Sequence, residues 1–345
     1  MDWFIAGFLV QDGLTAAAVY ALIAFSMVLI FSVTRVIFIG IGEFLSFAAL
    51  SMAALQSGNV PATVLLLIGL GFITFMALLW QAFIGKNTRI REQLLIDAIK
   101  LIVVPVVFYF VLSFYAPMRG NVLIDITLIL LLMLPFGGMI YRIFYQPIAE
   151  ASVLILLIFS VAIHFSLLGL GLLMFGPEGV RTLLITDVNI NLLGIPVTGQ
   201  AIFIVILTLV LIAALWLFFT RSLTGKALQA TAVNSRGAHL VGIGSHEAGR
   251  LAFTLGIVLA ALCGVMISPI ATIAYDTGFL IALKGFVAAI IGGLYSFPVS
   301  ALGAILVGIV EVFSAFWAST YKEIIVFTLI IPVLLWQSLN GKHHH

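Results

Sequence analysis

Three ionisable side chains lie within strongly apolar stretches of this sequence: Glu43, His164 and Glu311. Charged groups are expensive to hold in apolar surroundings, so residues of this kind mark functional sites by default. The alternative is that each side chain hydrogen-bonds a neighbouring helix and fixes its packing, and the sequence leaves both interpretations open. An enzyme working inside a membrane would need at least two such groups to converge, and these three are far apart along the chain.

Motifs for other kinds of chemistry are incomplete. Gly-Lys pairs occur at 85–86 and 225–226, but Asn87 and Ala227 follow them, so neither completes a nucleotide-binding loop that ends in Gly-Lys-Ser/Thr. No set of Cys and His has metal-ligand spacing, and no serine nucleophile elbow is present. Cys263 is the only cysteine and is expected to pack in an apolar helix. The sequence therefore predicts no catalytic residue, no metal and no cofactor.

The composition is that of a protein in contact with membrane lipid. Hydrophobic residues make up 63% of the chain and charged residues 8%, with a mean hydropathy of +1.31, whereas soluble domains carry about 25% charged residues. The apolar runs lack the two-residue alternation of membrane barrel strands. We therefore expect an all-α polytopic membrane protein, a single transmembrane domain over 1–342, with no nucleic-acid-binding surface. Residues 343–345 are treated as the remnant of an expression tag.

About eleven apolar segments follow one another along the chain, of which 9–11 are expected to be transmembrane helices. They are 10–32, 36–55, 61–84, 100–116, 122–140, 151–175, 198–220, 250–275, 280–295, 299–318 and 323–338. If the polar loop 221–250 is cytoplasmic, counting backwards places the N-terminus outside. Most Lys and Arg residues then fall inside, as the positive-inside rule requires, and only Arg119 and Arg181 fall outside.

One short or broken helix is predicted near 280–298, because Gly292, Gly293 and Pro298 interrupt it. Either a short tilted helix spans the membrane and leaves the C-terminus inside, or the segment is re-entrant. The first alternative is favoured because it places Lys342 in the cytoplasm. Small residues repeat every four positions on both sides of the break, in Gly285-Ala289-Gly293 and Ser300-Ala304-Gly308, which predicts close helix packing. The hairpin is also a candidate for an element that moves or lines a path.

Two other polar regions connect the apolar segments. The loop 176–197 is too polar to span, and its alternation from Leu184 to Leu193 predicts a short extracytoplasmic hairpin. It is either a docking surface or a plain connection. The amphipathic stretch 85–100 is expected to lie along the inner membrane surface.

The polar loop 221–250 is predicted to carry a short helix rich in small residues, which can seat deeply in the cleft of a partner. Asn234-Ser235 and Gly237 are expected to break this helix, and Gly242 is expected to end it. Ser245 is expected to cap the next helix, with Glu247 in its first turn. The residues assigned to partner contact are Ala227, Ala230, Asn234, Gly237, Ala238, Leu240 and Gly242.

The sequence resembles the LivH-type permeases of the branched-chain (hydrophobic) amino acid class of ABC importers. Three blocks carry the resemblance: 12–44 (DGLTAAAVYALIAFSMVLIFSVTRVIFIGIGEF), 226–243 (KALQATAVNSRGAHLVGI) and 278–311 (GFLIALKGFVAAIIGGLYSFPVSALGAILVGIVE). A weaker match covers 141–165. Together they cover about a third of the chain.

The resemblance implies a multi-pass permease of a bacterial or archaeal cytoplasmic (inner) membrane, with 226–243 as the coupling helix that sits in a groove of an ATPase subunit. The implied partners are two ABC ATPase subunits, an extracytoplasmic substrate-binding protein and a second permease subunit, LivM-like or a second copy. The implied substrate is a hydrophobic or branched-chain amino acid or a related small carboxylate. ATP hydrolysis would belong to the ATPase chains, so this chain is not expected to be an enzyme.

The chain departs from the family pattern in two places. Where the family carries Asn-Phe-Ala-His-Gly-Glu, residues 38–43 read Phe-Ile-Gly-Ile-Gly-Glu, and 61–120 is longer by about two helices. If 38–43 lines the pathway, its wall is less polar than usual, and preference should shift toward large apolar or aromatic substrates. The alternative is that Phe38 and Ile41 face lipid or a neighbouring helix. The candidate pathway-lining residues are Phe38, Ile41, Gly42, Glu43, His164, Gly292 and Gly293.

Two other classes of protein compete with this interpretation. An ion-coupled secondary transporter with broken helices would explain the break near 292 and the acidic residues Glu43 and Glu311. It would not explain the Ala-rich polar helix. An intramembrane enzyme is disfavoured, because the sequence shows no convergent catalytic pair.

Overall fold

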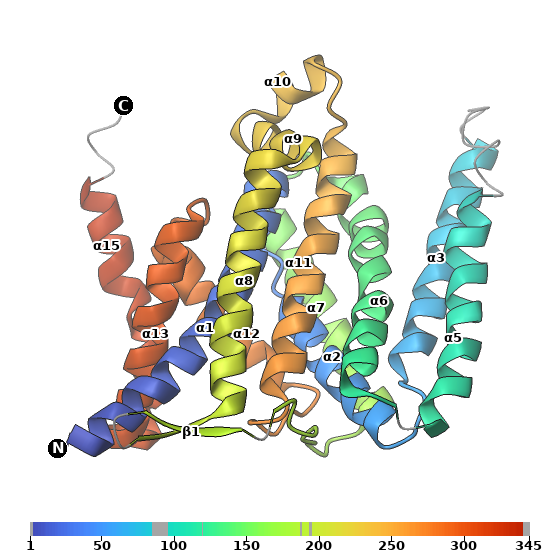
Figure 1. Cartoon of the computed structure of the whole chain (residues 1–345). Coiled ribbons are helices and arrows are strands. Elements are labelled where there is room, and N and C mark those ends of the chain that lie inside the picture. The colour runs from blue at the N-terminus through green and yellow to red at the C-terminus, as the bar shows by residue number, and fades with distance from the viewer. Residues whose placement is uncertain (1–2, 85–95, 119, 187, 193–194, 341–345) are drawn as a thin grey trace.

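The computed structural model describes residues 3–84, 96–118, 120–186, 188–192 and 195–340, and most of these residues are helical (Figure 1). The helices are α1 (Trp3–Thr34), α2 (Ile41–Gln56), α3 (Thr63–Ile84), α5 (Val104–Tyr115), α6 (Val122–Ile140), α7 (Val153–Phe175), α8 (Gly199–Arg221), α9 (Leu223–Val233), α10 (Ser235–Leu240), α11 (Ser245–Ile267), α12 (Thr277–Ile291), α13 (Phe297–Ala318), α14 (Lys322–Thr328) and α15 (Ile330–Asn340). Short helical turns are η1 (Ile99–Val103), η2 (Ala116–Met118), η3 (Tyr141–Tyr145), η4 (Gln146–Ile148) and η5 (Ser319–Tyr321).

The expectation of an all-α polytopic membrane protein agrees with the structure. Among the described residues, 8 helical stretches are long and apolar enough to cross a membrane, and α2 and α12 are shorter apolar helices of 16 and 15 residues. One of the 8, Phe297–Leu335, covers both of the predicted segments 299–318 and 323–338, which η5 separates. The count of about eleven therefore stays a prediction. Helix α12 is the short helix expected near 280–298.

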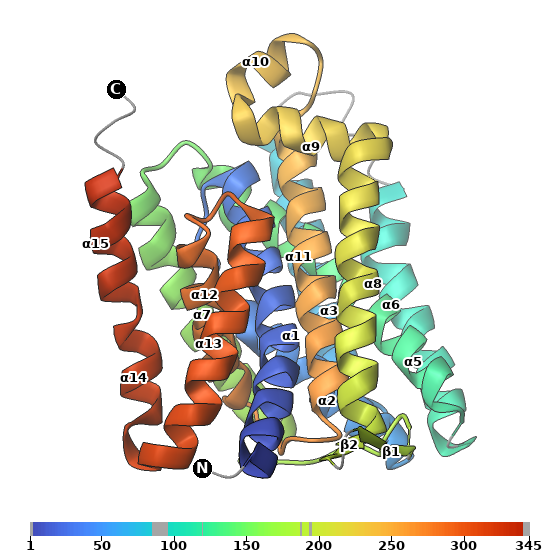
Figure 2. The same ribbon diagram turned by 60° about the vertical axis from the view of Figure 1, so that its left-hand side comes forward.

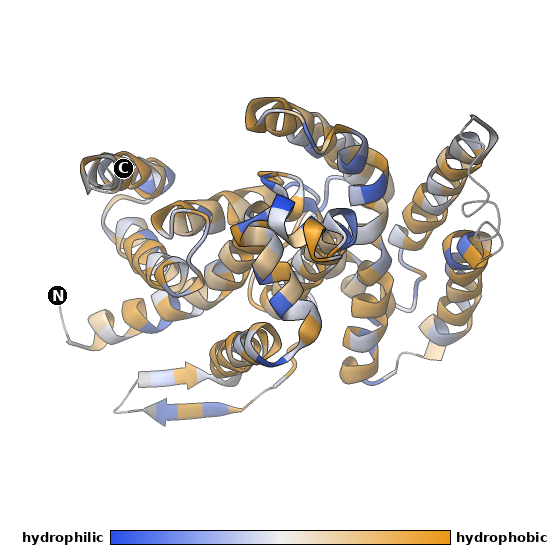
Figure 3. Cartoon of the chain, turned by 90° about the horizontal axis from the view of Figure 1, so that it is seen from above, coloured by the Kyte–Doolittle hydropathy of each residue, from blue (hydrophilic) through white to orange (hydrophobic). Residues whose placement is uncertain are grey.

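The bundle has two distinct ends (Figures 1 and 2). Helices α9 and α10 stand beyond one end, here called the α9 end, and α15 finishes on the same side. The N-terminus and the strands lie at the opposite end. Seen from above in Figure 3, hydrophobic residues dominate the peripheral helices. Residues 85–95 of the predicted surface helix lie outside the described residues, and 96–100 begin the span Ile96–Met118 instead.

The hairpin predicted in the loop 176–197 exists, but its strands lie later than expected. Strand β1 (Asn189–Leu192) pairs antiparallel with β2 (Ile195–Thr198). The predicted alternation begins at Leu184, and the backbone amides on both sides of this residue donate hydrogen bonds to side chains of other segments. The amide of Leu183 donates to the side chain of Gln56 at 2.8 Å, and the amide of Ile185 donates to that of Gln200 at 3.2 Å. The first half of the loop is therefore held against the bundle and is not available to form a strand.

Glycines let the central helices approach one another closely. Gly42 of α2 and Gly278 of α12 face each other, and a Cβ atom added to either would overlap the backbone of the other. Gly308 of α13 lies in the same way against the backbone of α1, and a Cβ atom added to Gly285 of α12 would overlap the side chain of Ile23 in α1. In lipid, where no hydrophobic force brings helices together, small residues of this kind allow close packing. The small-residue stripes therefore serve packing in this structure, except at Gly293, which is exposed and belongs to the turn after α12.

Gly278→Ala is expected to lower the free energy of unfolding by about 3 kcal/mol, because its new methyl group would overlap backbone atoms of Gly42 that cannot rotate away. Gly169→Ala in α7 is the matched control, since no heavy atom lies within 4 Å of its added Cβ. Thermal unfolding in detergent would measure both variants. Equal unfolding midpoints would contradict the close contact of α2 with α12.

Candidate functional site

The polar loop 221–250 folds into two short helices whose ends are set by local capping. The hydroxyl of Ser222 accepts a hydrogen bond from the amide of Gly225 at 2.9 Å and begins α9. Asn234 has an extended backbone that ends α9, and its side chain accepts from the amide of Gly237 at 2.9 Å to begin α10. The predicted break at Asn234 is confirmed, and Gly237 lies inside the second helix.

The connection to α11 differs from the prediction in one residue. Gly242 turns the chain with φ at +88°. Gly244, with extended backbone, is the N-cap of α11, and Ser245 is already its first helical residue. The expected cap by Ser245 is therefore wrong, because this residue lies one position too late. Glu247 lies in the first turn as predicted.

Helix α9 rests on a small hydrophobic cluster that is distinct from the main core. We call this cluster the α9 seat; it consists of Leu29, Val33, Phe219, Leu228, Ala248 and Ala252. Leu228 of α9 is only 1% exposed and anchors the helix there. Gly225 brings the start of α9 so close to the end of α8 that an added Cβ would overlap the carbonyl group of Phe218.

The outer surface of α9 and α10 exposes large apolar side chains. The exposed fractions are 86% for Leu223, 85% for Val233, 87% for Leu240 and 77% for Val241. These residues belong to the element that stands clear of the bundle (Figure 2). Because contiguous apolar surface of this kind marks interaction sites, the element is suited to bind another protein.

The small residues assigned to partner contact divide into two groups. Ala230 is exposed on α9 beside Val233. Ala238 is buried within the element itself at 4% exposure, and Ala227 and Gly237 are half-buried. Ala230, Asn234, Leu240 and Gly242 are therefore the assigned residues that are exposed for direct contact, and Ala238 supports the fold of α10.

Glu43 of α2 and His164 of α7 meet in the interior, although 121 positions separate them in the sequence. Nδ1 of His164 lies 2.7 Å from Oε1 of Glu43, and the imidazole stacks on the ring of Phe279 from α12 with centroids 4.3 Å apart. Glu43 is completely buried, and its Oε2 has no hydrogen-bond partner among the described residues. The sequence singled out both residues but did not predict that they pair.

The pair can hold a proton between an imidazole and a carboxylate, or accept a further donor at the free oxygen of Glu43. In surroundings of low polarity, the hydrogen bond between the two groups lowers the free-energy cost of burying each of them. Within the described ranges, no group of three His, Cys, Asp or Glu side chains could hold a metal ion. The geometry therefore supports binding or helix positioning.

A second polar cluster joins four helices. Nζ of Lys284 in α12 lies 2.6 Å from Oε1 of Glu311 in α13 and 3.1 Å from Oε1 of Glu323 in α14, and the hydroxyl of Tyr20 in α1 donates to Glu311. The sequence analysis singled out Glu311 but missed Tyr20 and Glu323. Lys284 could have indicated the cluster from the sequence, because a lysine within an apolar membrane helix requires an acidic partner.

Two other candidate pathway residues, Phe38 and Ile41, lie in packed regions. Phe38 is 1% exposed and contacts the rings of Phe44, Tyr145 and Phe253, and Ile41 is fully buried. Both side chains face neighbours within the chain in this structure, and their role in lining a path stays a prediction.

The predicted break after α12 is present and has the hydrogen bonds of a helix C-cap. The amide of Leu294 donates to the carbonyl of Ala289 at 2.9 Å, and the amide of Gly293 donates to that of Ile290 at 2.8 Å. Gly293 has φ at +63°, the left-handed conformation that this ending requires. A Cβ added to Gly292 would overlap the hydroxyl of Ser300, so the turn is compact.

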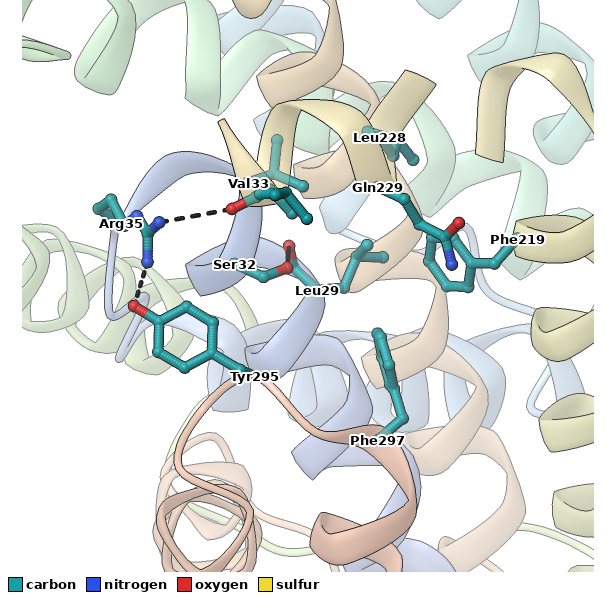
Figure 4. Close-up of a pocket in the computed structure, with 11 residues that line it drawn as sticks. Leu29, Ser32, Val33, Arg35, Phe219, Leu228, Gln229, Tyr295 and Phe297 are labelled. Carbon is teal, nitrogen blue, oxygen red and sulfur yellow. Dashed lines mark hydrogen bonds between the residues drawn. The ribbon is translucent and has the colours of Figure 1, made fainter. Parts of the chain in front are cut away.

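A cavity of about 590 Å³ lies under α9 (Figure 4). Its walls come from the end of α1, from α8 and α9, and from the turn between α12 and α13. The polar residues in the lining are Ser32, Arg35, Gln229 and Tyr295. None of these four residues is among the site residues predicted from the sequence.

Comparison with known proteins identifies relatives. A family model described as "Branched-chain amino acid transport system / permease component" matches residues 9–334. The chain is 32% identical over 211 residues to the high-affinity branched-chain amino acid transport system permease protein BraD of Pseudomonas aeruginosa, covering 59% of this chain and 68% of BraD. It is 31% identical to the corresponding LivH proteins of Salmonella typhimurium and Escherichia coli, covering 58% of this chain and 67% of each. No solved structure matches the chain.

Proposed function

The chain belongs to the family of branched-chain amino acid transport permease components, and on this premise we propose that it is the transmembrane permease subunit of an ATP-driven ABC importer. The substrate is a hydrophobic or branched-chain amino acid or a related small carboxylate, delivered by an extracytoplasmic binding protein. The membrane is the cytoplasmic membrane of a bacterium or archaeon. The α9 end faces the cytoplasm, the N-terminus lies outside, and residues 1–342 form one permease domain.

The observation that carries the proposal is the exposed apolar surface of α9 and α10. Leu240 and Val241 are 87% and 77% exposed on an element that also carries the exposed Ala230. Burying a large aliphatic side chain contributes about 1.5–3 kcal/mol, so a partner that covers this element gains substantial affinity. An ATPase subunit with a groove for a short helix fits this surface, because Ala230 adds little bulk to the exposed side of α9.

The distribution of charge supports the orientation. Arg221, Lys226 and Arg236 are exposed on or beside α9 and α10. At the opposite end, Arg181 lies in the loop before β1 and Lys322 begins α14. Cations are retained preferentially on the cytoplasmic side of a membrane. The α9 end is therefore the side on which ATPase subunits are found.

The permease performs no covalent chemistry in this scheme. Two ABC ATPase subunits hydrolyse ATP and press on α9 and α10, and the helices of the bundle respond by changing which side of the membrane the pathway opens to. The pathway forms with a second permease subunit, which is a LivM-like chain or a second copy of this one. The loop that carries β1 and β2 lies on the side from which the binding protein approaches.

Leu240→Glu is expected to weaken co-purification of the ATPase subunit at least about tenfold, because transferring a carboxylate into an apolar contact costs more than the corresponding 1.4 kcal/mol. Leu183→Glu is the matched control, since Leu183 is 66% exposed in the loop at the opposite end. Both variants should insert into membranes in equal amounts. If Leu240→Glu retained the ATPase as well as Leu183→Glu does, α10 would not be the docking surface.

An ion-coupled secondary transporter is the second candidate, favoured by the two buried polar clusters around Glu43 and Lys284. The two candidates differ in their energy source. In vesicles containing the purified proteins, the importer requires ATP and the ATPase subunits, whereas a secondary transporter works from an ion gradient alone. Uptake driven by an ion gradient without ATP would overturn the importer assignment.

A further inference from the structure

Two bulky residues of the described chain have left-handed backbone conformations, and they lie next to each other in space. Arg35, directly after α1, has φ at +61°, and Leu294, in the turn between α12 and α13, has φ at +62°. Side chains other than glycine seldom adopt this conformation, and the surrounding structure must hold them there. Residues held in this way cluster at functional sites and switch regions, so this part of the protein is a candidate for a moving element.

The side chain of Arg35 joins three elements at this point. One guanidinium nitrogen donates to the hydroxyl of Tyr295, and the guanidinium carbon lies over the ring of Tyr295, 5.0 Å from its centroid. The other nitrogen, Nη2, lies 3.4 Å from the carbonyl oxygen of Ala232 in α9. Figure 4 shows both interactions from one guanidinium. We call this connection between α1, α9 and the α12–α13 turn the Arg35 bridge.

The cavity under α9 leaves space between α9 and the α12–α13 turn, the two elements that the Arg35 bridge connects. Figure 4 shows α9 above the cavity and Tyr295 and Phe297 below it, with Arg35 at one side. The buried contacts of α9 belong to the α9 seat, and Phe297 at the start of α13 packs against both the α9 seat and the main core, so a shift of α9 toward the turn would act on the α9 seat first. A displacement of Ala232 is passed through the guanidinium to Tyr295.

The element that receives this displacement is connected to the interior. Tyr295 follows the glycine turn at the end of α12, and the same helix carries Gly278 against α2, Phe279 against His164, and Lys284. Movement of the turn along the axis of α12 therefore reaches both buried polar clusters. We propose that Arg35 is a positioning residue that transmits movement of α9 to the α12–α13 hairpin, an inference that rests on the importer function proposed above.

The experiment compares transport with ATP hydrolysis in the same vesicles, using the complete complex of permease and ATPase subunits. Arg35→Asn removes the guanidinium, and asparagine tolerates the left-handed backbone. We expect this variant to bind the ATPase and hydrolyse ATP normally, while the amount of substrate taken up per ATP falls about tenfold. Lys100→Asn is the control, because Lys100 is an exposed cation in η1, outside the bridge.

Tyr295→Phe tests the other half of the bridge with a smaller change. It keeps the ring under the guanidinium and removes the hydroxyl, so uptake per ATP should fall less than in Arg35→Asn. The double variant should be no worse than Arg35→Asn, because both changes remove one contact. A merely structural brace would not change the ratio of uptake to hydrolysis.

The possible outcomes distinguish failure of the Arg35 bridge from failure of the importer function. Normal uptake per ATP in Arg35→Asn, or losses that add in the double variant, would overturn the bridge and leave the importer function standing. If Arg35→Asn does not fold, normal uptake per ATP in Tyr295→Phe would overturn the bridge in its place. A wild-type chain that binds no ATPase would overturn the importer function and the bridge with it.

Discussion

His164→Leu is expected to lower the free energy of unfolding by about 3–5 kcal/mol, because it leaves the carboxylate of Glu43 buried without a partner. Replacing both residues by leucine should recover most of this loss, since two apolar side chains of similar volume leave no charge behind. The matched control is His246→Leu at an exposed histidine, which should change stability by less than about 0.5 kcal/mol. Unfolding of the purified protein in detergent would measure all three. A single variant as stable as the control would show that the pair carries no charge compensation.

The same double variant separates a packing role from a transport role. If the pair only positions α2 against α7, the double variant should be stable and should transport normally. We expect it to be stable and to transport poorly, because Oε2 of Glu43 is buried without a partner and packing alone does not require a free acceptor. Uptake by the reconstituted complex decides between the two roles.

Ala230→Trp is expected to reduce uptake about 100-fold, which corresponds to a loss of about 3 kcal/mol in docking free energy. Ala230 is exposed, so the indole meets no other part of this chain and acts only where a partner must approach. Gly237→Trp is a less clean change, because an added Cβ already lies 3.1 Å from the side chain of Asn234 that caps α10.

The control for this prediction is Ala214→Trp, an exposed alanine on the apolar helix α8. Both tryptophan variants should be produced and inserted normally, and only Ala230→Trp should fail to retain the ATPase. Normal uptake with Ala230→Trp would remove α9 from the docking surface.

Features that depend on neighbouring residues could be predicted from the sequence. The run lengths of apolar residues predicted the helices, and the capping chemistry of Asn234 predicted the division between α9 and α10. The end of α12 followed from adjacent glycines, one of which adopts the left-handed conformation. The predicted N-cap of α11, Ser245, is wrong by one residue, because Gly244 adopts the extended backbone conformation of the cap.

Features that depend on contacts between distant segments could not be predicted in the same way. The strands of the loop 176–197 begin later than predicted because the side chains of Gln56 and Gln200 accept hydrogen bonds from the earlier backbone. Neither glutamine lies in the alternating stretch 184–193 from which the hairpin was predicted. The pairing of Glu43 with His164 depends on how α2 lies against α7, which no periodicity in either helix specifies. Arg35 and Tyr295 meet for the same reason, 260 positions apart.

The Lys284 cluster has a consequence for how the protein enters the membrane during synthesis. Helix α12 has only 15 residues, and a lysine at the centre of an isolated helix opposes insertion by about 2.5–3.5 kcal/mol. Both carboxylates that compensate Lys284 are translated later, Glu311 in α13 and Glu323 in α14. Helix α12 therefore becomes stable in lipid only after these two helices have left the ribosome, and we expect the last three segments to leave the insertion machinery as one group.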